Sequence, residues 1–128
     1  LELKNYVKFV GRLDNVNVLK KMESSDLLLL PSVEEGIANV VLEAMTIGLI
    51  VISTNCGGMS EVVKNRHNGL LIESRSPKDI FKAIKLILSL SESEKSKMRN
   101  NAKETILTQH DMKDSIGKFC ELYKKSLN

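Results

Sequence analysis

The chain of 128 residues has no tryptophan, two tyrosines and three phenylalanines. Proteins hold unpaired bases by stacking them on aromatic side chains, so this scarcity argues against a nucleic-acid partner. Long hydrophobic runs are also missing, since none approaches the ~18 apolar residues that a membrane-spanning helix needs. With 42% hydrophobic and 27% charged residues, the composition is typical of a soluble globular fold and excludes a disordered or fibrous chain.

Cysteine is scarce as well. Cys56 and Cys120 lie far apart, and neither belongs to a CxxC pair or a Cys/His cluster. Such clusters supply the thiolates and imidazoles of structural zinc sites. We therefore expect two small, buried or half-buried thiols in a reducing compartment and no metal site.

The net charge of +3 hides an uneven distribution. Residues 26–73 hold two basic and six acidic side chains, whereas residues 74–128 hold twelve basic and seven acidic ones. A basic tail can attract an anionic membrane surface, or it can simply form solvated helix faces. We favour solvated faces, because the lysines alternate with acids at helical spacing, and we keep weak membrane-surface association as the second interpretation.

Apolar periodicity predicts alternating strands and helices. The strands are expected at residues 7–11, 26–30, 49–53 and 70–72. Helices are expected between them at 16–23, 38–47 and 61–63, and capping signals predict a helical C-terminal third. This alternation predicts an α/β fold in which a Rossmann-like parallel sheet of about four strands is flanked by helices. The whole chain, residues 1–128, is expected to be one domain.

The segment most able to carry chemistry follows the apolar run 26–30. It is a polar loop, residues 31–37, which leads into the helix expected from Ala38. In open α/β sheets, ligands bind outside the carboxyl ends of the strands. A helix N-terminus there attracts anions such as a diphosphate, and Gly36 lets the backbone approach a ligand closely.

The expected helix carries a narrow polar stripe. From Ile37 to Ile47 its polar residues are Asn39, Glu43 and Thr46, which lie on one face at helical spacing. In one interpretation the stripe is only a solvent-facing surface. In the other it faces a ligand, because a carboxylate accepts two parallel hydrogen bonds and so suits the adjacent hydroxyls of a ribose.

Several segments, in this order, resemble the donor-binding region of retaining GT-B glycosyltransferases, specifically glycosyltransferase family 4. The family motif has two glutamates with seven residues between them, which is the spacing of Glu35 and Glu43. The similarity covers residues 6–90. The segments that carry it besides this motif are 7–11, 26–32, 48–52, 57–63 and 68–72.

The resemblance implies a role for each matching position. Glu43 would bind the ribose hydroxyls of a nucleotide-sugar donor, and Glu35 would lie beside the donor sugar as the catalytic residue. Arg12 and Leu13 would lie beside the base. Backbone N–H groups after Gly36 would contact the sugar or the diphosphate. They belong to Ile37, Ala38, Asn39 and Val40.

Two departures from the family pattern matter. The family often has Phe-Gly or Phe-Pro where this chain has Ile37-Ala38, which would reshape the sugar pocket without affecting the ribose contact. The Arg and Lys that bind the phosphates in the family come from a segment upstream of these residues. Arg12 does not replace them, because it follows a different strand.

The expected function is that of the later part of the second, donor-binding domain of a GT-B enzyme. The parent enzyme would transfer a sugar from a nucleotide diphosphate donor to a hydroxyl of a sugar or lipid-linked acceptor, with retention and without a metal or other cofactor. It would serve polysaccharide or glycoconjugate synthesis in the cytoplasm or at the inner membrane face. Without the N-terminal acceptor domain, residues 1–128 alone are expected to be inactive.

Two alternatives stay open. One is a non-catalytic nucleotide- or sugar-binding module of the same fold. The other is a Rossmann-like interaction domain in which the two glutamates are only solvated surface. If the two carboxylates face an open cleft, the transferase and the binding module are favoured over the interaction domain.

Overall fold

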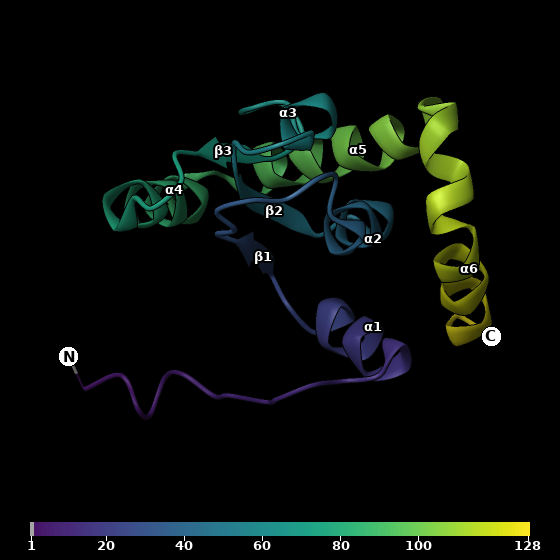
Figure 1. The fold of residues 1–128 in the computed structure, drawn as a ribbon, viewed down its shortest axis with the longest axis horizontal. Coiled ribbons are helices and arrows are strands. Elements are labelled where there is room, and N and C mark those ends of the chain that lie inside the picture. Colours follow the sequence, from purple (N-terminus) through teal and green to yellow (C-terminus); the bar gives the residue numbers. More distant parts are fainter. Residues whose placement is uncertain (1) are drawn as a thin grey trace.

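The computed structural model describes residues 2–128, apart from the side chains of residues 110–116 and 118. A parallel sheet lies among helices (Figure 1). Its described strands are β1 (Leu27–Leu30), β2 (Ile50–Thr54) and β3 (Leu70–Ile72), in the spatial order β1-β2-β3. Leu27 pairs with Ile50 in register, and both strand pairs are parallel. The predicted α/β class, with a parallel sheet flanked by helices, is confirmed.

The helices follow the capping signals closely. Ser76 caps α4 by accepting a hydrogen bond from the Asp79 N–H, and Ser91 and Glu94 form a complete capping box at the start of α5. Gly48 ends α2 in the left-handed conformation, with φ of 77°. The described helices are α1 (Asn15–Glu23), α2 (Asn39–Ile47), α3 (Met59–Val62), α4 (Pro77–Ser89), α5 (Glu92–Thr108) and α6 (His110–Ser126).

Strand β2 lies at the centre of the fold, and all five of its residues are buried. Because side chains alternate across a strand, Val51 contributes to the apolar cluster on one face of the sheet, with α2, α3 and the later part of α5. Ile50 and Ile52 belong to the cluster on the other face, with α4 and the first turns of α5. The continuous apolar run therefore has the two-sided burial expected in a parallel sheet.

The predicted strand at residues 7–11 is wrong. These residues form no strand, and Figure 1 shows the segment before α1 running apart from the sheet. Phe9 is 95% exposed. Alternating side chains fit a strand, but a strand also needs a neighbouring strand to pair its backbone groups, and within residues 2–128 no strand lies beside this segment. The sheet consequently has three described strands instead of about four.

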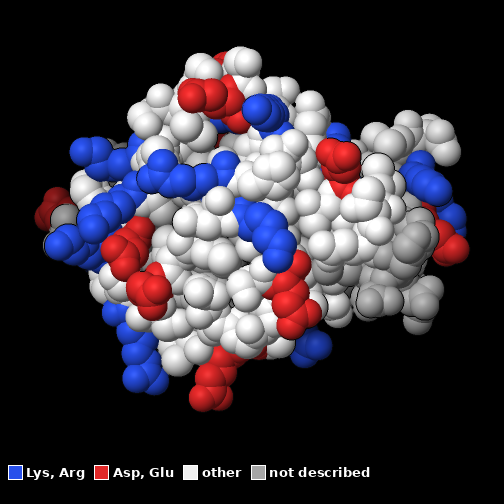
Figure 2. Space-filling view, turned by 90° about the horizontal axis from the view of Figure 1, so that it is seen from above, with Lys and Arg blue, Asp and Glu red and all other residues white. Residues whose placement is uncertain are grey.

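Charged side chains of both signs are interspersed on the face shown in Figure 2. Charges of opposite sign also meet within α5, where Lys95 and Arg99 both approach Glu92, at 3.3 Å and 4.0 Å. This mixture fits the interpretation of solvated helix faces. In the part of the chain that the structure describes, no helix is long and apolar enough to cross a membrane.

Candidate functional site

The predicted site lies at the carboxyl edge of the sheet. Strands β1 and β2 are parallel neighbours, so the loops that follow them, residues 31–38 and 55–58, emerge at the same edge. The Asn55 N–H donates to the Ile72 carbonyl at 2.8 Å and so joins the end of β3 to them. Helix α2 begins directly after the first loop. This edge is where ligands bind in open α/β folds.

The two loops are in direct contact. The buried Thr54 hydroxyl donates to the Ser32 carbonyl, and the Cys56 thiol lies 3.7 Å from the same oxygen. Gly57 has φ of 54°, and a Cβ built on it would lie 1.6 Å from the Glu35 carbonyl oxygen. The second loop therefore packs against the backbone of the first loop at the residue predicted to act on the sugar.

Glu35 is exposed at this edge. The Ser32 hydroxyl donates to its carboxylate Oε2 at 3.4 Å, a long and therefore weak hydrogen bond. Gly36 and Ile37 are exposed beside it, and no atom lies within 4 Å of a Cβ built on Gly36. The carboxylate and the backbone that follows it are consequently open to a ligand.

The N-terminus of α2 is also available. The N-cap residue is Ala38, which offers no side-chain acceptor to the N–H groups of the first turn. Those groups include the N–H groups of Asn39 and Val40, two of the predicted donor contacts. An uncapped helix start with its positive dipole end favours an anion. Ala38 itself is buried, so only its backbone can contribute.

Glu43 is half-buried on α2, and this burial raises the pKa of its carboxyl above the usual value. Among the described residues its carboxylate has no ion-pair or hydrogen-bond partner. The rest of the polar stripe is divided: Asn39 is exposed, whereas the Thr46 hydroxyl donates to the Leu42 carbonyl of its own helix at 2.7 Å. The buried face of α2 is apolar, as predicted, and comprises Val41, Leu42, Ala44 and Met45.

Arg12 and Leu13 are not brought to this edge. They belong to the segment before α1, which Figure 1 shows apart from the sheet. The expected position of a base-contacting strand end depended on the strand at 7–11, which is not formed. The role of these two residues beside a base stays a prediction.

The structure adds a contact between two residues, Thr54 and Ser32, that the sequence did not mark as a pair. Thr54 and Ser32 join the two loops, and their only sequence signal is a hydroxyl residue just beyond an apolar run. Glu61 lies in the same area, since a Cβ on Gly58 would meet Ile37 Cγ1 at 2.9 Å and Glu61 Oε1 at 3.6 Å. The second loop and the start of α3 therefore border the Glu35 loop.

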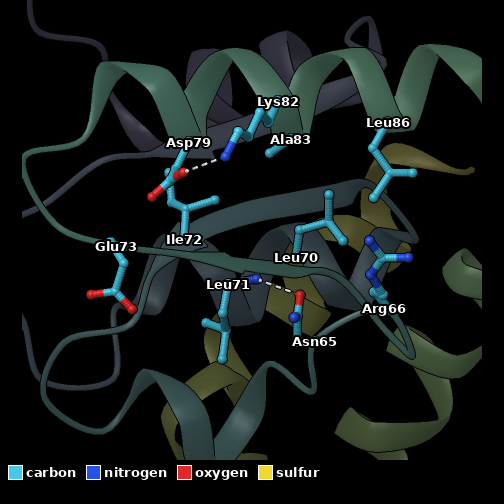
Figure 3. A pocket seen from close by; sticks show the side chains of 10 residues that line it. All are labelled: Asn65, Arg66, Leu70, Leu71, Ile72, Glu73, Asp79, Lys82, Ala83 and Leu86. Atoms are coloured by element: carbon cyan, nitrogen blue, oxygen red, sulfur yellow. Dashed lines mark hydrogen bonds and ion pairs between the residues drawn. The ribbon is translucent and has the colours of Figure 1, made fainter.

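Described cavities lie elsewhere. Figure 3 shows one of about 300 Å³ between β3 and α4, at the edge of the sheet opposite β1. Its charges are of both signs, with Lys82 3.6 Å from Asp79, and the Asn65 Oδ1 accepts from the Leu71 N–H. The described side chains contain no group of three or more His, Cys, Asp or Glu that could hold a metal ion. The predicted site is an exposed edge, separate from this cavity.

Comparison of the sequence with known families gives a match over most of the chain. The model of the family described as "Glycosyl transferases group 1" matches residues 1–105. N-acetyl-alpha-D-glucosaminyl L-malate synthase of Bacillus anthracis is 32% identical over 123 residues, which are 96% of this chain and 32% of the relative. The UDP-Gal:alpha-D-GlcNAc-diphosphoundecaprenol alpha-1,3-galactosyltransferase of Escherichia coli is 31% identical over 125 residues, 96% of this chain and 31% of its own. The chain thus spans about a third of these relatives.

Solved structures share the fold. The C-terminal domain of the group 1 glycosyl transferase LpcC from Francisella tularensis superposes with a TM-score of 0.67 at 23% identity, covering 81% of this chain and 52% of that domain. Anabaena HepE in complex with UDP-glucose superposes with a TM-score of 0.73 at 22% identity, covering 91% of this chain and 33% of that protein. At these identities the similarity is one of fold.

Proposed function

Because the chain belongs to the glycosyl transferase group 1 family, we propose that residues 1–128 are the later, donor-binding part of the second domain of a GT-B enzyme. The chain spans about a third of the curated relatives, as a part of such an enzyme would. The superposition on a solved C-terminal domain of the same family supports this placement. The partner of this part would be an N-terminal acceptor domain of the parent protein.

One observation carries the proposal: two glutamates with seven residues between them lie around the uncapped start of α2, Glu35 in the loop before it at the carboxyl edge of the sheet and Glu43 within the helix. The Glu43 carboxylate, which has no partner among the described residues, would accept hydrogen bonds from the two ribose hydroxyls. The N–H groups at the start of α2 would contact the diphosphate or the sugar. The exposed Glu35 would contact the donor sugar and stabilise positive charge that develops on it.

The proposed reaction transfers the sugar to an acceptor hydroxyl with retention of anomeric configuration, as in glycosyltransferase family 4. The bond between the anomeric carbon and the diphosphate breaks, the acceptor oxygen bonds to that carbon, and the departing diphosphate takes the acceptor proton. No metal or other cofactor is part of this proposal. The Escherichia coli relative, named for a diphosphoundecaprenol-linked sugar, supports a sugar or lipid-linked acceptor. The proposal also includes a role in glycoconjugate synthesis, in the cytoplasm or at the inner membrane face.

The excess of acidic side chains in residues 26–73 bears on this reaction. A helix N-terminus at an exposed site contributes only ~0.3–1 kcal/mol to anion binding. Tight binding of a diphosphate therefore requires basic groups from other parts of the parent protein. For this reason donor binding belongs to the whole enzyme, and residues 35–43 supply the ribose and sugar contacts together with the N–H groups at the start of α2.

The test is calorimetric titration of the full-length protein with UDP-, GDP- and ADP-sugars, comparing the wild type with Glu43→Ala. Loss of a charged bidentate contact is expected to cost about 1.5–3 kcal/mol, or roughly 10- to 150-fold in donor affinity. Glu104→Ala is the matched control, since Glu104 is an exposed glutamate on α5.

An unchanged donor affinity in Glu43→Ala would contradict the ribose role and would favour a solvent-facing stripe. Donor binding without transfer to any acceptor would favour the non-catalytic binding module.

A further inference from the structure

Thr54 is a buried polar residue at the end of the central strand. It is 1% exposed, and its hydroxyl donates to the carbonyl of Ser32, which lies 22 residues earlier in the chain. A half-buried carbonyl that loses its donor costs free energy, so this hydrogen bond fixes where the first loop crosses the edge of the sheet. The bond joins the end of β2 to the loop after β1.

The two ends of this bond differ in rigidity. Strand β2 is buried throughout between two apolar clusters. Residues 33–37 are all exposed and form no regular structure. The loop that carries Glu35 therefore has few attachments of its own, and Thr54 ties it to the most buried element of the fold.

Two further residues of the second loop contact the first loop near the Ser32 carbonyl. The Cys56 thiol lies 3.7 Å from the Ser32 carbonyl oxygen and 3.4 Å from the Thr54 hydroxyl, so it is a second, weaker donor to this region. Gly57 adds a close backbone contact, because even a Cβ there would overlap the Glu35 carbonyl oxygen. The loop is thus held from Ser32 to Glu35 by residues 54–57.

From these contacts we infer that Thr54 is a positioning residue for the sugar-transfer step, acting through Ser32 on Glu35. The inference rests on the proposed function, because it assumes that Glu35 contacts the donor sugar. Ser32 also contacts the Glu35 carboxylate at 3.4 Å, so a shift of Ser32 moves both the backbone and the side chain of the acidic group. Misplacement of a reacting group by about 1 Å can reduce a rate by about a hundredfold.

Nucleotide binding depends on a different support. Glu43 lies on α2, whose buried residues pack in the apolar cluster with α5 and β2. Loss of the Thr54 hydroxyl leaves that packing in place. Removal of the hydroxyl should therefore lower turnover while the affinity for the bare nucleotide is preserved.

The experiment compares Thr54→Val, which keeps the shape and removes the hydroxyl, with Thr54→Ser, which keeps the hydroxyl. Both are made in the full-length protein and measured for kcat, for UDP and GDP affinity, and for amide hydrogen exchange of residues 32–37. We expect Thr54→Val to lower kcat by about 10- to 100-fold, with nucleotide Kd changed by less than about threefold. We expect Thr54→Ser to restore kcat, and residues 32–37 to exchange faster only in Thr54→Val.

Ser53→Ala is the matched control, because Ser53 is the adjacent buried hydroxyl and, among the described residues, donates only to the Thr54 carbonyl. It should leave kcat and exchange of residues 32–37 unchanged. Cys56→Ala removes the weaker donor and should lower kcat by a smaller factor. This variant keeps the inference testable if Thr54→Val does not fold.

The outcomes separate the two proposals. Normal kcat in a folded Thr54→Val, equal losses in Thr54→Val and Thr54→Ser, or a parallel loss of nucleotide affinity would each overturn the positioning role. If the wild type neither binds nor transfers a nucleotide sugar, the proposed function fails. In that case faster exchange of residues 32–37 in Thr54→Val alone still supports the hold on the loop, and unchanged exchange overturns it.

Discussion

The loop pair at the carboxyl edge and the turn at residues 62–69 use polar side chains in opposite ways. In the loop pair, Glu35 is exposed and has one long hydrogen bond. In the turn, Asn68 is fully buried and has all its contacts inside the protein. Its Oδ1 accepts from the Lys64 N–H at 2.7 Å, and its Nδ2 donates to the Val62 carbonyl at 3.0 Å and the Thr105 hydroxyl at 2.9 Å.

This contrast separates binding from stability. A polar group with unused hydrogen-bonding capacity at the surface can be satisfied by a ligand, whereas a saturated buried group can only support the fold. The turn is further joined to α5 by Asn101, whose Nδ2 donates to the His67 carbonyl at 2.9 Å. Substitutions in the two regions should therefore affect different measured quantities.

The largest expected effect is on stability, from Asn68→Ala. The change leaves the Lys64 N–H and the Val62 carbonyl without their buried partner, which should lower the free energy of unfolding by about 2–4 kcal/mol. Urea unfolding measures it. Asn100→Ala, at an exposed asparagine of α5, is the control and should change stability by less than about 0.5 kcal/mol. If Asn68→Ala lowers the free energy of unfolding by less than about 1 kcal/mol, the turn does not differ from the loop pair in its contribution to stability.

The next effect is on transfer, from Glu35→Gln in the full-length protein. Replacing the charged acceptor by a neutral amide should cost about 1–2 kcal/mol in the transition state, or roughly 5- to 30-fold in turnover. UDP or GDP affinity and the unfolding midpoint should hardly change. Glu34→Gln, at the exposed neighbour, should leave turnover unaltered. Loss of nucleotide affinity with intact turnover would reverse the assignment of Glu35 to the sugar.

The smallest effect is a pH dependence of stability from Glu43. Burial raises its pKa in the folded state above the unfolded value, so the folded state binds this proton more tightly. Stability is favoured below the unfolded pKa and decreases as the pH rises through the raised folded pKa. Glu43→Gln should remove this decrease and raise stability at neutral pH by less than about 1 kcal/mol. Thermal unfolding from about pH 4, near the normal Glu pKa, to about pH 7 measures it, and an unchanged slope would contradict it.

Local chemistry made much of the fold predictable. The helix α2 was expected because its apolar spacing, its start after a polar loop and Gly48 all agree, and the caps at Ser76 and Ser91 depend only on residues three positions apart. The segment 7–11 shows the limit of this reasoning. Its alternation is that of a strand, but pairing depends on a neighbour far away in the sequence.

The candidate site was predictable to the same extent. The spacing of Glu35 and Glu43 and the position of the loop relative to a buried strand could be read from the sequence. The Thr54 hydrogen bond could not, because its partner Ser32 is 22 residues away and any hydroxyl at a strand end has the same local pattern. The sequence also does not reveal that the Thr46 hydroxyl donates to a carbonyl of its own helix.

Gly57 and Gly36, two of the three glycines in the loop pair, impose different evolutionary constraints. Gly57 has positive φ and no space for a Cβ beside the Glu35 carbonyl, whereas a Cβ on Gly36 would meet open solvent. In a library of variants selected only for folding, Gly57 should stay fixed and Gly36 should drift to larger residues. Under selection for sugar transfer, Gly36 should become fixed too, because a bound donor would fill the space beside it. The range of residues tolerated at position 36 therefore indicates whether related proteins still bind a donor at this edge of the sheet.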